Sequence, residues 1–67
     1  MLMYLILITE AKNKSLIGSI WEIDEKGETA VCIAPNNSSF KTNCKIPCSL
    51  LGNYSSRRLE RLDEELK

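Results

Sequence analysis

Hydrophobic residues gather in four short segments of this chain, with polar breaks between them. The first segment, about 3–9, is a continuous apolar run, and the second, 16–23, is apolar on both of its alternating faces. Short runs that are apolar on both faces are typical of strands in the middle of a sheet or at a subunit interface. We therefore expect two strands, with a bulge, a bend or a close neighbour at Gly18 in the second.

The second and third segments carry the clearest local signal, a β-hairpin. The sequence Asp-Glu-Lys-Gly at 24–27 favours a type I turn with Gly27 in the left-handed conformation. The third segment, 28–34, alternates between two sets of side chains. One face carries Thr29, Val31 and Ile33, and the other carries Ala30, Cys32 and Ala34. Pro35 ends this strand because proline cannot donate to the ladder, and a fourth short strand is expected at about 44–46.

The C-terminal residues have the pattern of an amphipathic helix. We expect this helix over about 55–66, capped by one of the serines that open it. Leu59, Leu62 and Leu66 form a single apolar stripe along it. Arginines at its start and acids near its end oppose the helix dipole, so the helix is marginal alone and has to dock.

Together these elements predict an α+β fold in one small domain over residues 1–67. An antiparallel β-meander of three to four strands, at about 3–47, packs against the C-terminal helix. An SH3-like curl of the meander is one form of this architecture. The predicted core consists of Leu5, Ile6, Leu7, Ile8, Ile17, Ile20, Trp21, Ile23, Val31, Ile33, Leu59 and Leu62.

The length of the chain limits how stable a monomer can be. A single core in a chain of 67 residues rarely supplies more than about 3–5 kcal/mol. Two strands with two apolar faces each leave apolar surface that one small sheet cannot hide. Association with a second copy or with another protein is therefore expected.

Charge and composition exclude several classes of function. The chain has nine Lys and Arg, nine Asp and Glu and no His, so its formal net charge is zero. Dedicated nucleic-acid-binding proteins usually carry a basic excess. Without histidine, no Ser-His or Cys-His nucleophile pair can form. We expect a protein that is not an enzyme and that needs no cofactor.

The cysteines and the N-terminal run bear on the compartment. Cys32, Cys44 and Cys48 are odd in number, and no histidine can complete a zinc site. Free thiols are typical of the reducing cytosol. The apolar N-terminal run is far shorter than the ~20 residues of a membrane span, and it lacks the basic start of a signal peptide. The expectation is a cytoplasmic protein with no bound metal and no membrane partner.

A modest basic segment lies inside this neutral chain, at 41–61. The candidates for contact with a partner, in or beside this segment, are Phe40, Tyr54, Arg57, Arg58 and Arg61. The leading hypothesis is a non-catalytic regulatory or inhibitory module that binds another protein, and homodimerisation is compatible with it. An RNA- or DNA-binding regulator is the first alternative, because cations beside aromatic rings bind single strands. A thiol metal or redox carrier is the second, because thiolates hold soft metals.

Three stretches are similar to the carbon-storage-regulator family of RNA-binding proteins. They are residues 5–9 (Leu-Ile-Leu-Ile-Thr), 16–18 (Leu-Ile-Gly) and 33–36 (Ile-Ala-Pro-Asn). The chain departs from that family at Glu10 and Ala11, where the family has basic residues. We therefore do not assign the chain to it, and the resemblance supports only the nucleic-acid alternative.

Overall fold

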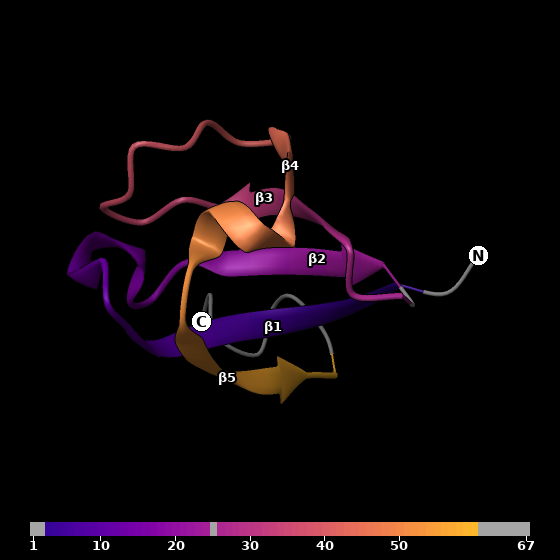
Figure 1. Ribbon diagram of the computed structural model, residues 1–67, viewed down its shortest axis with the longest axis horizontal. Coiled ribbons are helices and arrows are strands. Elements are labelled where there is room, and N and C mark those ends of the chain that lie inside the picture. The colour runs from indigo at the N-terminus through magenta and orange to yellow at the C-terminus, as the bar shows by residue number, and fades with distance from the viewer. Residues whose placement is uncertain (1–2, 25, 61–67) are drawn as a thin grey trace.

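The computed structural model describes residues 3–24 and 26–60, and its strands join in one antiparallel sheet. The strands are β1 (Met3–Ala11), β2 (Ile20–Asp24), β3 (Thr29–Ala34), β4 (Lys45–Pro47) and β5 (Tyr54–Leu59). Two short 3-10 turns, η1 (Lys14–Leu16) and η2 (Cys48–Leu51), precede β2 and β5. The strand order is β4-β3-β2-β1-β5, so the last strand lies beside the first (Figure 1).

The predicted α+β class is wrong, because the described part of the chain is all-β. The residues expected to open the C-terminal helix form β5 instead, and β5 pairs with β1 through Leu7 opposite Arg57. Two arginines at the start of a helix oppose its dipole, whereas pairing as a strand satisfies backbone groups on the second side of β1. Residues 61–67 of the expected helix lie outside the described residues. No helix in the described part is long and apolar enough to cross a membrane.

The predicted hairpin between β2 and β3 is confirmed. Gly27 has a φ of +72°, and its N–H donates to the carbonyl of Asp24 at 2.9 Å. The Asp24 carboxylate accepts from the Glu28 N–H at 2.8 Å and from the Thr29 hydroxyl at 3.1 Å. One side chain therefore holds the far end of the turn to its start.

Another side chain lies close to Gly18, which is one of the three explanations that the sequence analysis gives for this glycine. Its φ is +91°, and a Cβ at this position would lie 2.6 Å from Nδ2 of Asn36. That amide donates to the carbonyl of Ile17 at 2.9 Å. Only glycine combines this φ with this contact at low cost, so the loop after β1 is held to the loop after β3.

The β3–β4 pairing continues past its regular part through a bulge. The N–H of Asn43 donates to the Cys32 carbonyl at 2.7 Å, and the Cys32 N–H donates to the Cys44 carbonyl at 2.9 Å. Asn43 has a φ of +68°. This is the pattern of a G1 bulge, whose first residue is left-handed, and asparagine tolerates that conformation. The short strand expected at 44–46 is observed as β4, one residue later.

The core centres on Trp21, which is fully buried. Its indole N–H donates to the Ser19 hydroxyl at 2.9 Å, and that hydroxyl donates to the Leu16 carbonyl. The Phe40 ring meets the indole edge-on, with 5.2 Å between the centroids and 80° between the planes. A buried tryptophan needs a partner for its N–H, and the buried serine supplies it.

The register between β2 and β3 decides which face of β3 is buried. Trp21 lies opposite Cys32, and Ile23 lies opposite Ala30. The small side chains of β3 leave room for the large side chains of β2, because a close-packed core has a fixed volume to fill. The predicted core face of β3 is therefore wrong.

The predicted core is confirmed in part. Buried as predicted are Ile6, Ile8, Ile20, Trp21, Ile23 and Leu59. Half-buried instead are Leu5, Leu7, Ile17, Val31 and Ile33, and Leu62 lies outside the described residues. The buried apolar residues that the sequence analysis missed are Leu16, Ala30, Cys32, Ile46 and Leu51. Most of these belong to elements that are too short to show a hydrophobic period.

A second apolar cluster lies on the other face of the sheet. Leu7 lies opposite Ile20 of β2, and Leu5 lies opposite Leu59 of β5. Ile20 and Leu59 are only 2% and 4% exposed, although neither belongs to the cluster around Trp21. The expectation that β1 has two apolar faces is therefore confirmed.

We expect Ser19→Ala to destabilise the fold by about 1–3 kcal/mol, because it leaves the buried indole N–H of Trp21 without its acceptor. The measurement is the free energy of unfolding in urea. A Trp21→Phe background removes that N–H, so Ser19→Ala should cost less there. Equal losses in the two backgrounds would contradict the role assigned to the hydroxyl.

The β2–β3 hairpin gives the stability a pH dependence. The hydrogen bond from the Glu28 N–H is the main cause that lowers the pKa of Asp24 below its usual 3.8, and the Thr29 hydroxyl also lowers it. Because the folded-state pKa lies below the unfolded one, this carboxylate stabilises the fold above about pH 4. The contribution is lost as the pH falls through the folded-state pKa. Urea unfolding between about pH 6 and pH 2 should show a steeper acid loss for the wild type than for Asp24→Asn. Superimposable pH profiles would rule this out.

Candidate interaction site along the edge strand

The structure brings three of the five predicted contact residues together. Tyr54, Arg57 and Arg58 all lie on β5. Phe40 does not join them, because its ring packs against the core indole. Arg61 lies outside the described residues. The candidate site is therefore built on β5.

β5 forms one edge of the described sheet, and β4 forms the other (Figure 1). β4 has three residues and ends at Pro47, whereas β5 has six residues and no proline. A longer edge without proline offers more main-chain groups to an added strand. Lys45, a cation of the predicted basic segment, lies on β4, so the sheet order separates it from the arginines of β5.

The backbone of β5 directs its polar groups alternately toward β1 and away from it. In β1, Ile8 uses its N–H and its carbonyl on the β2 side, in hydrogen bonds of 3.0 and 2.8 Å. Alternation then turns Leu7 toward β5, where it pairs with Arg57. It follows that Ser56 and Arg58 direct their N–H and carbonyl groups away from β1, as does the first residue of β5.

The two arginines lie on opposite faces of β5. Arg57 lies opposite Leu7, on the face of the second apolar cluster, and Arg58 lies opposite Ile6. The guanidinium carbon of Arg58 is 5.0 Å from the centroid of the Tyr4 ring. A guanidinium positioned over an aromatic ring is attracted to it by a cation–π interaction. Both arginine side chains are exposed.

Tyr54 anchors the start of β5. It lies opposite Ala11, is half-buried and packs against the core cluster. Burial raises the pKa of Tyr54, and the negative charges that Cys48 and Tyr4 would carry raise it further. Its hydroxyl is therefore a neutral hydrogen-bonding group at physiological pH.

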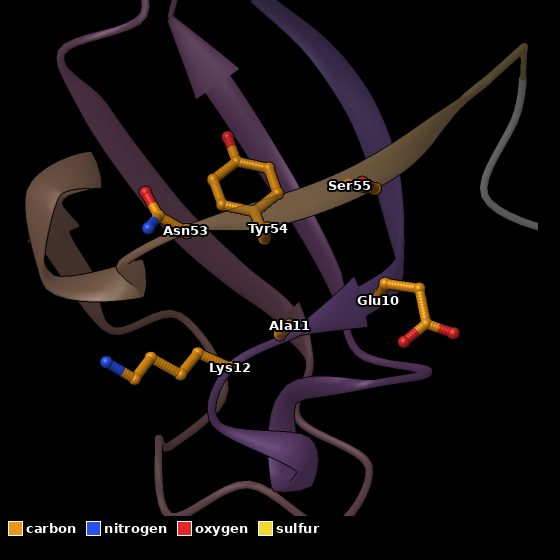
Figure 2. A pocket seen from close by; sticks show the side chains of 6 residues that line it. All are labelled: Glu10, Ala11, Lys12, Asn53, Tyr54 and Ser55. Atoms are coloured by element: carbon orange, nitrogen blue, oxygen red, sulfur yellow. The ribbon is translucent and has the colours of Figure 1, made fainter.

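An open hollow of about 280 Å³ borders the start of β5. It is lined by Glu10, Ala11, Lys12, Asn53, Tyr54 and Ser55. Figure 2 shows the side chains of Glu10 and Lys12 extending to opposite sides of the hollow, so the acid and the base do not converge on one point. Acid–base catalysis needs such convergence. The hollow instead offers the tyrosine ring and polar groups as a contact surface.

A second hollow, also of about 280 Å³, borders the end of β5. Its lining residues are Met3, Tyr4, Leu5, Glu22, Arg58, Leu59 and Glu60. The candidate site is therefore the outward edge of β5 with a hollow at each end. The sequence analysis missed Tyr4, which contacts Arg58, and Glu22, which lines this hollow, because only the pairing of the strands places them there.

The cysteines form no comparable site. All three are free thiols. Burial raises the pKa of Cys32, with the neighbouring Cys44 adding to it, and burial also raises the pKa of Cys48, with Asp24 adding to it. The thiolate, which is the form that binds metals and reacts, is thereby disfavoured. Among the described residues, no three His, Cys, Asp or Glu side chains are grouped so that they could hold a metal ion.

Comparison with known proteins assigns no family to this chain. No protein-family model matches the sequence, and no solved structure matches the chain. A function for this protein therefore has to be argued from the geometry of β5 itself.

Proposed function

We propose that this protein is a non-catalytic interaction module, with a regulatory or inhibitory role, that binds another protein by accepting an added strand at β5. One observation carries the proposal: Ser56 and Arg58 direct main-chain groups away from β1, on an edge that has a hollow at each end. Segments that extend a sheet edge gain affinity from main-chain hydrogen bonds and specificity from side-chain contacts at alternate positions.

A different protein fits this edge better than a second copy of the chain. Pairing two copies of β5 would place four arginines on one seam, because each copy contributes Arg57 and Arg58. Like charges across a strand pair are unfavourable. The partner in this proposal is therefore a heterologous protein, and a homodimer formed through β5 is the less favoured arrangement.

The nucleic-acid alternative has weaker support from the geometry. Proteins that bind single strands present cations and stacking rings on one continuous surface. In this protein Lys45 lies on β4 and Arg57 and Arg58 lie on β5, at the two edges of the described sheet, and Phe40 packs against the core. The chain as a whole has no net charge.

The proposed module acts in the cytoplasm and carries no enzymatic activity. Its three free thiols suit a reducing compartment. The raised thiol pKa values of Cys32 and Cys48 favour packing over redox or metal chemistry for these residues.

The edge is tested with a substitution at Ser56. Proline there removes an outward N–H and leaves the hydrogen bonds between β1 and its partners in β5 in place. We expect a protein that the wild type captures from a cytoplasmic extract to be captured by Ser56→Ala as well, and to be lost with Ser56→Pro. Quantitative mass spectrometry of the captured proteins is the measurement.

Urea unfolding of each variant accompanies the capture experiment. A folded Ser56→Pro protein that still captures every partner of the wild type would show that β5 is not the binding edge. Arg58→Glu reverses a charge on the same edge without changing the backbone, and it provides the test if the proline variant does not fold. Loss of capture with a folded Arg58→Glu protein would support β5 as the binding edge.

A further inference from the structure

We infer that residues 61–67 of this chain lie across the second apolar face of the sheet, with Leu62 and Leu66 as the side chains that cover it. The second apolar face is the one on which Leu7 lies opposite Ile20. This position concerns a face of the sheet and not the outer edge of β5, so it goes beyond the proposed function and does not rest on it.

The second apolar face extends over four strands. Val31 of β3 belongs to it, because Val31 lies opposite Glu22 of β2, which in turn lies opposite Leu5 of β1. A contiguous apolar surface on a small protein marks a place of contact. The apolar side chains that the strand register places on this face are Leu5, Leu7, Ile20, Val31 and Leu59.

Two side chains of this face are buried more deeply than the sheet alone can bury them. Ile20 is 2% exposed and Leu59 is 4% exposed. Leu59 ends β5, an edge strand of the described sheet, so it has a neighbouring strand on one side only. Side chains stand roughly perpendicular to a sheet, so neighbours in the same sheet leave their tips open. The burial of these two residues therefore indicates a layer of atoms above the face.

The described connecting segments contribute their buried apolar side chains to the opposite face. Leu16 of η1 and Leu51 of η2 are buried in the cluster around Trp21, and Phe40 of the loop after β3 packs against that cluster. The layer above the second apolar face therefore has to come from another part of this chain or from another molecule.

Residues 61–67 begin beside this face and are long enough to cross it. The chain leaves β5 at Leu59, which lies on the face itself. Ile20 lies two strands across from Leu59 and two residues along the sheet, a distance of roughly 12 Å. A segment of seven residues can extend to about 23 Å. The segment can therefore reach both of the deeply buried side chains.

The composition of the segment also fits a cover with one apolar side. Leu62 and Leu66 are its two apolar residues, and charged side chains at the other positions can remain in water. This position does not restore the predicted helix over 55–66, because Tyr54–Leu59 form a strand. The charged residues of the segment are Arg61, Asp63, Glu64, Glu65 and Lys67.

Methyl NMR of the full-length protein with ¹³C-labelled Ile and Leu methyl groups tests this position directly. We expect nuclear Overhauser effects from the methyl groups of Leu62 or Leu66 to those of Ile20 and Leu59. An isotope-filtered spectrum of an equal mixture of labelled and unlabelled chains detects contacts between copies only. We expect these effects to be missing from the filtered spectrum.

Two results would overturn the inference. The same effects in the filtered spectrum would show that a second copy covers the face. If neither leucine of the segment shows an effect to the face in either spectrum, another occupant covers it. Neither result bears on capture of a partner at β5, which Ser56→Pro tests.

Substitutions test the same contact through stability. Leu62→Ala and Leu66→Ala remove buried apolar surface, so we expect each to lower the urea midpoint of unfolding by roughly 1 M. Leu50→Ala is the matched control, because Leu50 is 61% exposed, and it should leave the midpoint unchanged. Midpoints that are unchanged in all three variants would also contradict the inferred position.

Discussion

The indole N–H of Trp21 needs an acceptor inside the core, and the Ser19 hydroxyl provides it at 2.9 Å. That hydroxyl donates in turn to the Leu16 carbonyl, so the η1 turn is bonded to the entry of β2. The volume of the indole also determines its surroundings. Cys32 lies across from it on β3, and the Phe40 ring closes over it edge-on. The central strand β2 thus fixes the packing of its neighbour and of the loop that follows.

The edge of the sheet follows from this centre. β2 pairs with one side of β1, and β1 has apolar side chains on both faces and a second side of backbone groups to satisfy. β5 satisfies that side and becomes the outermost strand. An edge strand of six residues can pair with strands of other chains. Proteins usually limit such pairing by placing charged side chains on the edge strand. Arg57 and Arg58 place two charged side chains of this kind on β5.

Sequence reasoning succeeded where the determining interactions are local. The turn at 24–27 depends on its own residues, and so does its left-handed Gly27. It failed where a distant segment decides. The spacing of Leu59, Leu62 and Leu66 fits a helix, but residues 54–59 pair as a strand with β1, which is far away in the sequence. The alternation in β3 shows that the strand has two faces, but not which of them is buried. Which face is buried depends on the Trp21 indole of the neighbouring strand β2.

The candidate site shows the same division. Tyr54, Arg57 and Arg58 could be selected from the sequence because cations and an aromatic ring stand close together along the chain. Their arrangement on an edge could not, since it depends on the pairing of β5 with β1. Phe40 was selected by the same rule and belongs to the core instead. Tyr4 carried no signal at all, because its contact with Arg58 exists only after the first and last strands have met.

The pairing of β5 with β1 is the claim on which the edge and the position of its arginines depend, and proton NMR tests it directly. Ile6 and Arg58 are opposite each other in the ladder, as are Ile8 and Ser56. Both are pairs whose backbone groups point away from one another, and in such pairs the Cα atoms are only about 4.5 Å apart. We expect strong Hα–Hα nuclear Overhauser effects between the members of both pairs. Sequential amide–amide effects through residues 55–59, without the cross-strand ones, would show a helix and contradict the structure.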